Sequence, residues 1–510
     1  MMGIVLNRVL RNGRRVVFAL AAAAALAGCA VGPDFRRPEQ ALPVGYTAPA
    51  LPKVHPAVGG AAGETQAVVP GRDLPAQWWR LFRNAELDRL IRQALDDSPT
   101  LAAAGAALRQ AEENLRARSG AVYYPALDAS LSGARQKVSS AASGQPGTGG
   151  FTYGLYNASL VLSYDLDLFG GGRRELEELR SQVDYQRFQL EAAHLSLTAN
   201  IVTTVVREAS LRAQLATTRE MLAVQEQLRD LVARQLQLGG TTRVELLSQE
   251  SQVAQLRASL PLLEKELAWT RNQLAQYCAR FPSQAGLPEF SLDQLLLPPE
   301  LPLSLPSSLA RQRPDIRAAE ELLHAASARI GVATANLYPQ ITLSGGVGTQ
   351  AATLGKLLSS GSPIWSLGAG LLQPLFRGGE LTARRRAAIA AYDQATAQYR
   401  ETILKSFQSV ADVLQALDSD ATALVAQAES ERTARETLTL TRRQYEIGAT
   451  NYLLLLNAQR QQQQASIALI QARAARLADS AALFQALGGG WWNREAGADA
   501  AQPAEQEERR

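Results

Sequence analysis

Residues 173–238 read RRELEELRSQVDYQRFQLEAAHLSLTANIVTTVVREASLRAQLATTREMLAVQEQLRDLVARQLQL, a run without a glycine or a proline. A second run of the same kind, of almost the same length, covers residues 380–447. With a rise of about 1.5 Å per residue, each run would form a helix roughly 100 Å long. Helices of ordinary globular domains end after about three or four turns. The two runs therefore predict an elongated molecule whose helices span a distance.

Both runs end in the same kind of sequence, RQLQLGGTT at 234–242 and RQYEIGATN at 443–451. Glycine after a helix is a typical C-cap, and a threonine or asparagine soon after it can cap the next helix, so both ends are predicted to be tight helical hairpins. Upstream, Pro99 and Pro314 each precede a helical pattern that ends in Tyr-Pro. These two pairs of segments occur in the same order and with nearly the same offset along the chain. Their shared order and spacing predict an internal duplication.

Between the helices of each half lie two segments with a period of two residues, which is typical of strands with one apolar and one polar face. Their alternate positions hold mainly serine, threonine, glycine, aspartate or asparagine, with Val161 as an exception. The apolar positions are Leu127, Ala129, Leu131, Tyr156, Ala158, Leu160, Leu162, Tyr164 and Leu166 in the first half, and Ile341, Leu343, Val347, Trp365, Leu367, Ala369 and Leu371 in the second.

A soluble β-sandwich would show the same alternation, but four strands divided between two helical repeats make too small a sheet to bury its apolar face. A transmembrane barrel fits better, because its apolar face contacts lipid and its aromatic side chains lie near the membrane interfaces. Tyr156, Tyr164 and Trp365 are the candidate lipid-face aromatics. A barrel needs at least about eight strands to close. Since an open sheet edge is costly in hydrocarbon, the chain is expected to oligomerise.

The N-terminus has the pattern of a secretory signal. Four arginines precede an apolar run from Val16 to Ala27, which is well short of the ~20 residues needed to cross a bilayer. The run ends in Leu-Ala-Gly followed by Cys29, the pattern of bacterial lipoproteins. We therefore expect residues 1–28 to be removed and Cys29 to carry a covalent lipid, a diacylglycerol with an N-acyl chain. Ala30 follows instead of the aspartate associated with inner-membrane retention, which favours the outer membrane.

The charge balance argues against nucleic acid as a partner. The chain has 52 basic and 48 acidic residues, and the four arginines of residues 1–28 account for the difference. The arginines at 384–386 are most simply a solvated helix face. Cys278 is the only cysteine besides Cys29, so acylation of Cys29 would leave no internal disulfide.

The sequence offers no constellation of residues for catalysis or metal binding. Its three histidines, His55, His194 and His324, are scattered, which is unlike a metal site or a His-based triad. Glycines at 170–172 and 378–379 occupy matching strand-to-helix corners, and they lack the lysine and the spacing of a P-loop. We expect a protein that is not an enzyme, with no metal and no cofactor other than the lipid on Cys29.

Composition divides the chain into successive parts. Residues 76–281 and 314–487 are the two repeats, each with helices, two barrel strands and a long helical hairpin. Residues 282–313 form a Pro-rich linker between the repeats. After the signal peptide, residues 29–75 are rich in Pro, Ala and Gly and are predicted to be an extended, lipidated tether. Residues 488–510 are predicted to be a disordered tail.

Several motifs, taken in order, resemble the TolC-like outer membrane factors, and within them the lipoprotein branch that serves RND-type multidrug efflux pumps. These motifs are CAVGPDF at 29–35 with Pro38, WW at 78–79, RPDI at 313–316, NLYP at 336–339, FRGG at 376–379 and the segment 448–460. The resemblance implies a mainly α fold with a small β part. Three protomers, each giving four strands, would form one β-barrel in the outer membrane, continued by an α-helical barrel across the periplasm. Residues 282–313, with the tail, would surround the middle of the helical barrel.

In that family the closed end of the duct lies at the periplasmic tip, on the helix after the second hairpin. Matching its motif places Leu453, Asn457 and Arg460 toward the pore, on one helix face. We expect Leu453 to form an apolar ring and Arg460 to pair with an acid elsewhere. Relatives commonly carry aspartate at the position of Asn457, whose neutral amide makes hydrogen bonds roughly half as strong as charge-assisted ones. The alternative for Leu453 and Arg460 is an ordinary pattern of helix packing and solvent exposure.

The two hairpin ends are candidate docking sites for a periplasmic adaptor protein, and the alternative is that they are simply stable turns. Their residues are Gly239, Gly240, Thr241 and Thr242 in the first hairpin, and Gly448, Ala449, Thr450 and Asn451 in the second. The resemblance implies a passive, gated exit duct for drugs or other small molecules, fed by an inner-membrane RND-type pump. One alternative is an exit duct for an ABC or MFS exporter or a type I secretion system. Another is a lipid-anchored periplasmic scaffold or adaptor, which would leave the four strands without lipid contact.

Overall fold

The computed structural model describes residues 30–39, 43, 45–47, 54–55, 58–59, 62–139 and 150–494. The chain divides into two compact units. The first contains Met1–Pro38, Ala107–Arg187 and Ala318–Tyr399, and the second contains Glu39–Ala106, Phe188–Arg317 and Arg400–Arg510. The signal peptide, Cys29 and the end of the predicted tail (495–510) lie outside the described residues.

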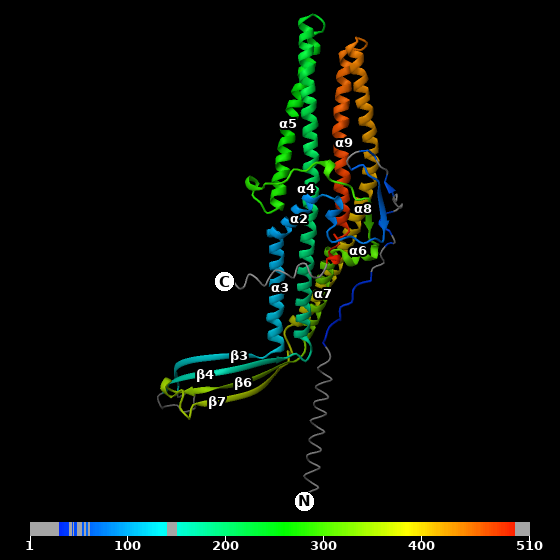
Figure 1. The fold of residues 1–510 in the computed structure, drawn as a ribbon. Helices are drawn as coiled ribbons and strands as arrows, with labels where there is room; N and C mark the ends of the chain where they lie inside the picture. Colours follow the sequence, from blue (N-terminus) through cyan, green and yellow to red (C-terminus); the bar gives the residue numbers. More distant parts are fainter. Residues whose placement is uncertain are drawn as a thin grey trace. The chain divides into compact units, whose positions relative to one another are not determined.

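The two repeats have the same order of elements (Figure 1). The long helices α4 and α8 each have 67 residues, and the helices that follow them, α5 and α9, each have 35. The two predicted long helices are therefore confirmed, and the equal lengths agree with a duplication. The elements of the first repeat are α3 (Pro99–Tyr123), β3 (Ala126–Val138), β4 (Phe151–Leu166), α4 (Gly171–Gln237) and α5 (Arg243–Tyr277), and those of the second are α7 (Pro314–Ala335), β6 (Gln340–Ala351), β7 (Pro363–Leu372), α8 (Glu380–Glu446) and α9 (Tyr452–Ala486).

The first unit contains a sheet with the strand order β3-β4-β6-β7, in which all neighbouring strands are antiparallel. The four predicted strands are confirmed, and each is longer than the alternating segment that predicted it. The first repeat contributes β3 and β4, and the second contributes β6 and β7. In the described part of one protomer, β3 and β7 each pair along one side only, so the sheet has two open edges.

The second unit has an apolar core that includes the short 3-10 helix η1 (Trp78–Phe82). The rings of Trp78 and Phe82 pack on Phe484 of α9, with centroid distances of 5.5 and 6.3 Å. Next comes α2 (Ala85–Asp97), whose N-cap Asn84 accepts a hydrogen bond from the backbone of Leu87 at 2.9 Å. One face of α2 is buried in this core. This packing fixes the start of the first repeat against the end of the second.

The prediction of an extended tether over residues 29–75 is wrong for part of that range. β2 (Gln66–Pro70) pairs in parallel with β5 (Glu300–Leu303) and antiparallel with β1 (Val54–His55). The side chain of Arg476, which is 1% exposed, donates to the backbone oxygens of Ala62 and Glu64 and to the side chain of Gln66. The composition of the segment gave no sign of this, because β5 and Arg476 lie in distant parts of the chain.

Two other boundary predictions also change. The linker 282–313 contains regular structure, namely β5, the helix α6 (Pro306–Gln312) and the 3-10 turns η2 (Pro282–Gln284) and η3 (Leu292–Gln294). The predicted disordered tail is wrong for residues 488–494, where η5 (Trp491–Asn493) follows three buried glycines. The indole N–H of Trp491 donates to the carbonyl of Gln312 at 2.7 Å, and that of Trp492 donates to Asp73. These two hydrogen bonds hold residues 488–494 against the rest of the second unit.

Candidate functional site: the sheet faces, the hairpin ends and the predicted gate

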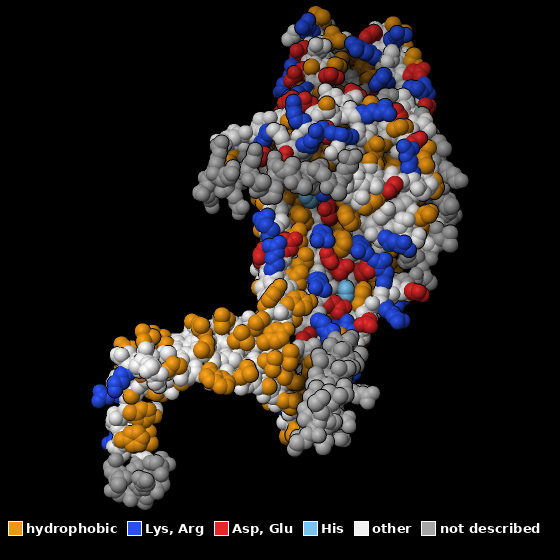
Figure 2. Space-filling model, turned by 60° about the horizontal axis from the view of Figure 1, so that its bottom comes forward, with side chains coloured by type: hydrophobic (Ala, Val, Ile, Leu, Met, Phe, Trp, Pro, Cys, Tyr) orange, Lys and Arg blue, Asp and Glu red, His pale blue; other side chains and the backbone are white. Residues whose placement is uncertain are grey.

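The four-stranded sheet has one continuous apolar face. Residues that are directly opposite in an antiparallel pair point to the same side of the sheet. Leu131 lies opposite Ala158, Leu160 opposite Val347, and Val347 opposite Trp365, so the predicted apolar positions of all four strands share one face. Figure 2 shows hydrophobic side chains gathered along this part of the molecule. Soluble monomers rarely expose so large an apolar patch, so this face is suited to an apolar environment.

The three predicted lipid-face aromatics all lie on that face. Tyr156 lies opposite Gly133, and its ring carbons are 3.1 and 3.2 Å from the position where a Cβ of residue 133 would be. Tyr164 lies opposite Leu343, and Trp365 is 81% exposed. The absence of a side chain at Gly133 therefore gives the Tyr156 ring its place. The position of these rings at a membrane interface remains a prediction.

The opposite face of the sheet is polar and small. The hydroxyl groups of Ser130 and Ser159 hydrogen-bond across β3 and β4 at 2.9 Å. Thr342 donates to the carboxylate of Asp165 across β4 and β6 at 2.6 Å. Neighbouring positions on this face include glycines at 346, 348, 368 and 370. Such a face suits contact with water.

The first predicted hairpin, between α4 and α5, is confirmed. Gly239 has a φ of 74°, in the left-handed region that glycine enters at little cost. The N–H of Gly240 donates to the carbonyl of Gln235 at 2.8 Å, which satisfies an end group of α4 in the Schellman manner. The hydroxyl oxygen of Thr242 accepts from the N–H of Glu245 at 3.3 Å, and Thr242 is thus the N-cap of α5.

The second hairpin, between α8 and α9, repeats this geometry. Gly448 has a φ of 75°, and the N–H of Ala449 donates to the carbonyl of Gln444 at 2.8 Å. The side chain of Asn451 caps α9 by accepting from the N–H of Leu454 at 3.0 Å. Both ends also expose apolar side chains, among them Leu238 (87% exposed) and Ile447 (79%). Each end is therefore a well-capped turn that presents apolar surface.

The predicted gate residues share one exposed face of α9. Leu453, Asn457 and Arg460 are all exposed, and their spacings of four and three residues place them on one side of the helix. The Nε of Arg460 donates to Oε1 of Gln252 on α5 at 2.9 Å. Among the described residues of one protomer, Arg460 therefore meets an amide and not the predicted acid. The assignment of these residues to a pore remains a prediction.

The sequence gave no sign of the contacts that join the two hairpins near their ends. The hydroxyl of Tyr452 on α9 donates to Oε1 of Gln249 on α5. The amide nitrogen of Gln249 donates to the backbone and side-chain oxygens of Gln225 on α4, at 2.8 and 2.6 Å. Tyr452 also packs with Val232 and Leu456 in a small apolar cluster. Buried glutamines look like ordinary helix-surface residues in a sequence, so they could not be recognised there.

Comparison with known proteins assigns the chain to a family. A family model described as "Outer membrane efflux protein" matches residues 90–280 and 305–489, which is more than half of the chain. The chain belongs to the outer membrane efflux protein family. This match covers both repeats, including the sheet and both hairpins.

Relatives of this outer membrane efflux protein match it over most of its length. The pyoverdine export outer membrane protein OpmQ of Pseudomonas aeruginosa is 35% identical over 422 residues, with 81% of this chain and 87% of the relative covered. The probable efflux pump outer membrane protein TtgC of Pseudomonas putida is 30% identical over 472 residues, covering 92% and 94% of the two chains. The protein is thus an efflux channel of the outer membrane.

Solved structures give the same result for the fold. The outer-membrane channel OprN superimposes with a TM-score of 0.81 at 28% identity, covering 91% of this chain and all of that one. The open state of the MtrE outer membrane channel of Neisseria gonorrhoeae gives a TM-score of 0.78, also at 28% identity, covering 91% and 99%. The expected fold class, a small β part continued by long helices, is confirmed for this efflux protein.

The described residues of the efflux protein were also compared with the requirements of a metal site and of a membrane-spanning helix. Within them, no three His, Cys, Asp or Glu side chains are placed to hold a metal ion. None of the described helices is both long enough and apolar enough to cross a membrane. Asp167, at the glycine-rich corner before α4, accepts from the N–H groups of Gly172 and Arg173 at 3.0 and 2.9 Å. This corner therefore caps the N-terminus of α4. The proteins of the family are channels and not enzymes.

Two carboxyl groups lie together between α8, the second long helix, and α9, the helix that follows it. Asp420 of α8 lies against Asp479 of α9. Burial, followed by the hydrogen bond and the charge of Asp479, raises the pKa of Asp420 to about 7, and Arg476 opposes the shift. At neutral pH Asp420 is therefore protonated for part of the time, which reduces its charge repulsion with Asp479.

Proposed function

We propose that this outer membrane efflux channel is a trimeric exit duct of a tripartite multidrug efflux system. Its inner-membrane pump is of the RND type, and a periplasmic adaptor links that pump to the hairpin ends. The main support for a trimer is the four-stranded sheet, which has an apolar face and two open edges, β3 and β7. Four strands cannot close into a barrel. Each unpaired backbone group at a sheet edge costs on the order of several kcal/mol in hydrocarbon. Three copies would supply twelve strands and pair every edge.

The duct itself is proposed to have little substrate selectivity. Relatives that are each about 30% identical to this chain or more are named for different cargoes, namely pyoverdine, toluene and antibiotics. The polar face of the sheet consists largely of small residues, such as Ser130 and Gly348, which offer few specific contacts. The pump would therefore choose the substrate, and this channel would release it.

Crosslinking in cells tests the partners. A photocrosslinking residue at Thr241 or Ala449, in the two hairpin turns, is expected to capture the periplasmic adaptor of an RND system, identified by mass spectrometry. Gln415 is the control position, because it is exposed in the protomer and lies in the middle of α8, away from both turns. Capture of an ABC or MFS exporter, or of its adaptor, would overturn the RND assignment. Capture of nothing at either turn by a correctly assembled channel would overturn the docking sites.

The gate assignment gives a first prediction. Leu453→Ser should remove the proposed apolar ring and allow water and ions to pass, so the single-channel conductance in planar bilayers and the sensitivity of cells to vancomycin should both rise. Leu454→Ser is the matched control, because Leu454 has a similar exposure (53% against 62%) but points to a neighbouring face of α9. Equal conductance of both variants and the unmodified protein would show that Leu453 is an ordinary surface residue.

Acylation of Cys29 is proposed from the signal pattern. Mass spectrometry of the N-terminal peptide from the membrane-bound protein should find three acyl chains on residue 29, and Cys29→Ser should abolish them. A free thiol at Cys29 in the mature protein would overturn this assignment.

A further inference from the structure

Residues 30–38, which follow the predicted acylation site, are fixed to the first unit. We call them the anchor segment. The N–H of Val31 donates to the carbonyl of Phe169, in the corner between β4 and α4, at 3.0 Å. Ala30 lies on Gly170, since a Cβ added to that glycine would be 2.6 Å from the Cα of Ala30. The segment therefore starts at the place where the sheet continues into a long helix.

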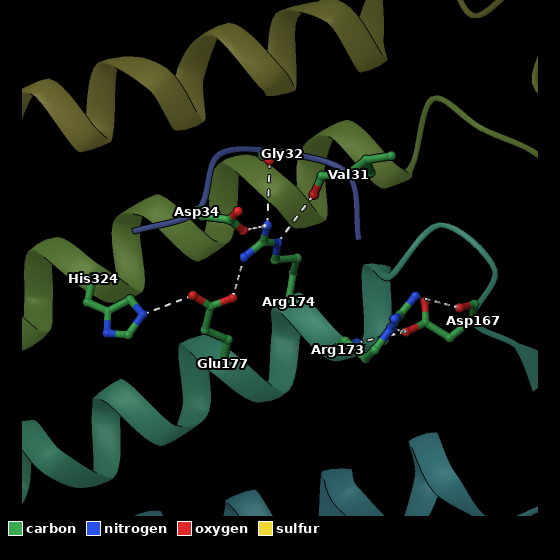
Figure 3. Close-up of polar contacts among 8 residues, drawn as sticks. All are labelled: Val31, Gly32, Asp34, Asp167, Arg173, Arg174, Glu177 and His324. Atoms are coloured by element: carbon green, nitrogen blue, oxygen red, sulfur yellow. Dashed lines mark hydrogen bonds and ion pairs between the residues drawn. The ribbon is translucent and has the colours of Figure 1, made fainter. Parts of the chain in front are cut away.

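Arg174 in the first turn of α4 binds this segment through several atoms (Figure 3). Its side chain is 7% exposed. It donates to the carboxylate of Asp34 at 2.6 Å and to the backbone oxygens of Val31 and Gly32 at 3.3 and 3.5 Å. It also donates to Glu177, one turn later in α4, at 2.7 Å. A buried guanidinium with these partners holds both the side chain and the backbone of the segment.

A second ion pair fixes the other end of the anchor segment. Arg37 donates two parallel hydrogen bonds to Glu320 of α7, at 2.5 and 2.6 Å. The Glu320 side chain is 7% exposed. Two-point contacts of this kind fix orientation as well as distance. The neighbouring Arg36 is exposed, and the Arg37 side chain is 41% exposed, so the bond to Glu320 and not burial distinguishes Arg37.

Between the two ion pairs, an aromatic contact holds the middle of the segment. The ring of Phe35 stacks on the imidazole of His324 in α7, with a centroid distance of 4.3 Å and an interplanar angle of 15°. His324 in turn contacts Glu177 at 2.9 Å, which links this stack to Arg174 (Figure 3). Gly32 lies against Gly331, where a Cβ on residue 32 would be 2.4 Å from the Cα of residue 331. α4 and α7 together thus form a site shaped for this segment.

We propose that this site is a dock for the anchor segment, and that it sets the depth at which the lipid enters the membrane. Ala30, the residue that directly follows the proposed acylation site in the sequence, is docked beside the β4–α4 corner. The dock would therefore bring the acyl chains to the end of the sheet where β4 leads into α4. Arg174, Glu320 and His324 are positioning residues for the anchor. The docking step stands on the contacts above, and its consequence for lipid depth rests on the proposed acylation of Cys29.

Limited proteolysis with chymotrypsin tests the dock directly in detergent-solubilised outer membranes that contain the full chain, where the periplasmic side is accessible to the protease. Cleavage after Phe35 requires its ring to leave His324 and enter the protease. The unmodified protein should resist cleavage there, and Arg37→Glu or Glu320→Arg should accelerate it at least tenfold. The double variant Arg37→Glu/Glu320→Arg restores opposite charges and should recover most of the protection. Arg36→Glu, with the same charge change at an exposed neighbour, should behave like the unmodified protein.

The same samples report whether docking positions the anchor. The fraction of chain in heat-modifiable trimers in the outer membrane should fall severalfold in both single charge variants and recover in the double variant. Rapid cleavage of the unmodified protein, or cleavage that does not respond to the single variants, would overturn the dock. A released Phe35 with an unchanged trimer fraction would overturn its role in placing the lipid. Neither measurement depends on transport, so failure of the proposed efflux function would be seen separately in the crosslinking experiment.

Discussion

At the scale of single residues, the environment of Asp420 changes the pKa of its carboxyl group. Burial and Asp479 raise the pKa of Asp420 to about 7, from an ordinary value near 4. The folded protein therefore holds this proton more tightly than the unfolded chain does. The stability that the proton provides is fully present below about pH 4 and is lost as the pH rises to about 7. Above pH 7 the folded and unfolded forms are both ionised, and this contribution no longer changes.

Asp420→Asn should therefore remove part of this pH dependence. An asparagine cannot ionise, so the variant should be more stable than the unmodified protein at pH 8, by about 1–2 kcal/mol after allowance for solvent screening. At pH 5 the difference should be smaller. Thermal unfolding of the detergent-purified protein at both pH values measures this. Asp412→Asn, a change at an exposed carboxylate of the same helix, is the control, and an equal effect of both substitutions would contradict the prediction.

At the scale of elements, the end of the first hairpin depends on glycine at position 239 because of the backbone conformation there. Gly239 has a positive φ and no atom within 4 Å of an added Cβ, so an alanine there would be strained but not crowded. Gly240 lies outside this φ region, and an added Cβ would be 3.5 Å from the carbonyl oxygen of Gln235, an ordinary contact. The two adjacent glycines therefore separate the cost of backbone conformation from the cost of packing.

Gly239→Ala should loosen the end of the first hairpin, and Gly240→Ala should not. The expected cost of the left-handed alanine is about 1 kcal/mol. That corresponds to roughly fivefold faster local opening. Hydrogen exchange of peptides that cover residues 236–246 would measure it. Similar exchange in the two variants would mean that the backbone at 239 relaxes without cost.

The sequence predicted elements well where a local pattern determines them. Both long helices follow from runs without Gly or Pro, and all four strands of the sheet follow from alternation. The failures occurred where distant partners decide the structure. β2 needs β5 to exist as a strand, and Trp491 is held by Gln312, which is far from it along the chain. The docking of Phe35 on His324 was missed for the same reason, since neither residue is unusual in its own neighbourhood.

At the scale of the whole molecule, the two faces of the sheet should respond oppositely to charge. Leu367 and Ser366 are adjacent in β7 and point to opposite faces. If the apolar face contacts lipid, an arginine in the middle of the membrane costs about 2–4 kcal/mol in each copy of the strand. An arginine on the polar face would be hydrated by water in the proposed duct.

Leu367→Arg should therefore lower the amount of heat-modifiable trimer in the outer membrane strongly, and Ser366→Arg should lower it little. Semi-native gel electrophoresis of membrane fractions gives both values under the same conditions. Equal loss in the two variants would mean that neither face is selectively in contact with lipid, which would favour a periplasmic scaffold over a channel.

The equal lengths of the paired helices restrict how a protein of this kind can change its reach. α4 and α8 have 67 residues each, and α5 and α9 have 35 each. An α-helix gains about 1.5 Å and turns by about 100° with every residue added, so faces return to register only after about seven residues, or two turns. A lengthening confined to one helix would shift Tyr452 away from Gln249 and separate the two hairpin ends. Relatives adapted to a wider or narrower periplasm should therefore differ by insertions or deletions of whole double turns, made in all four helices together.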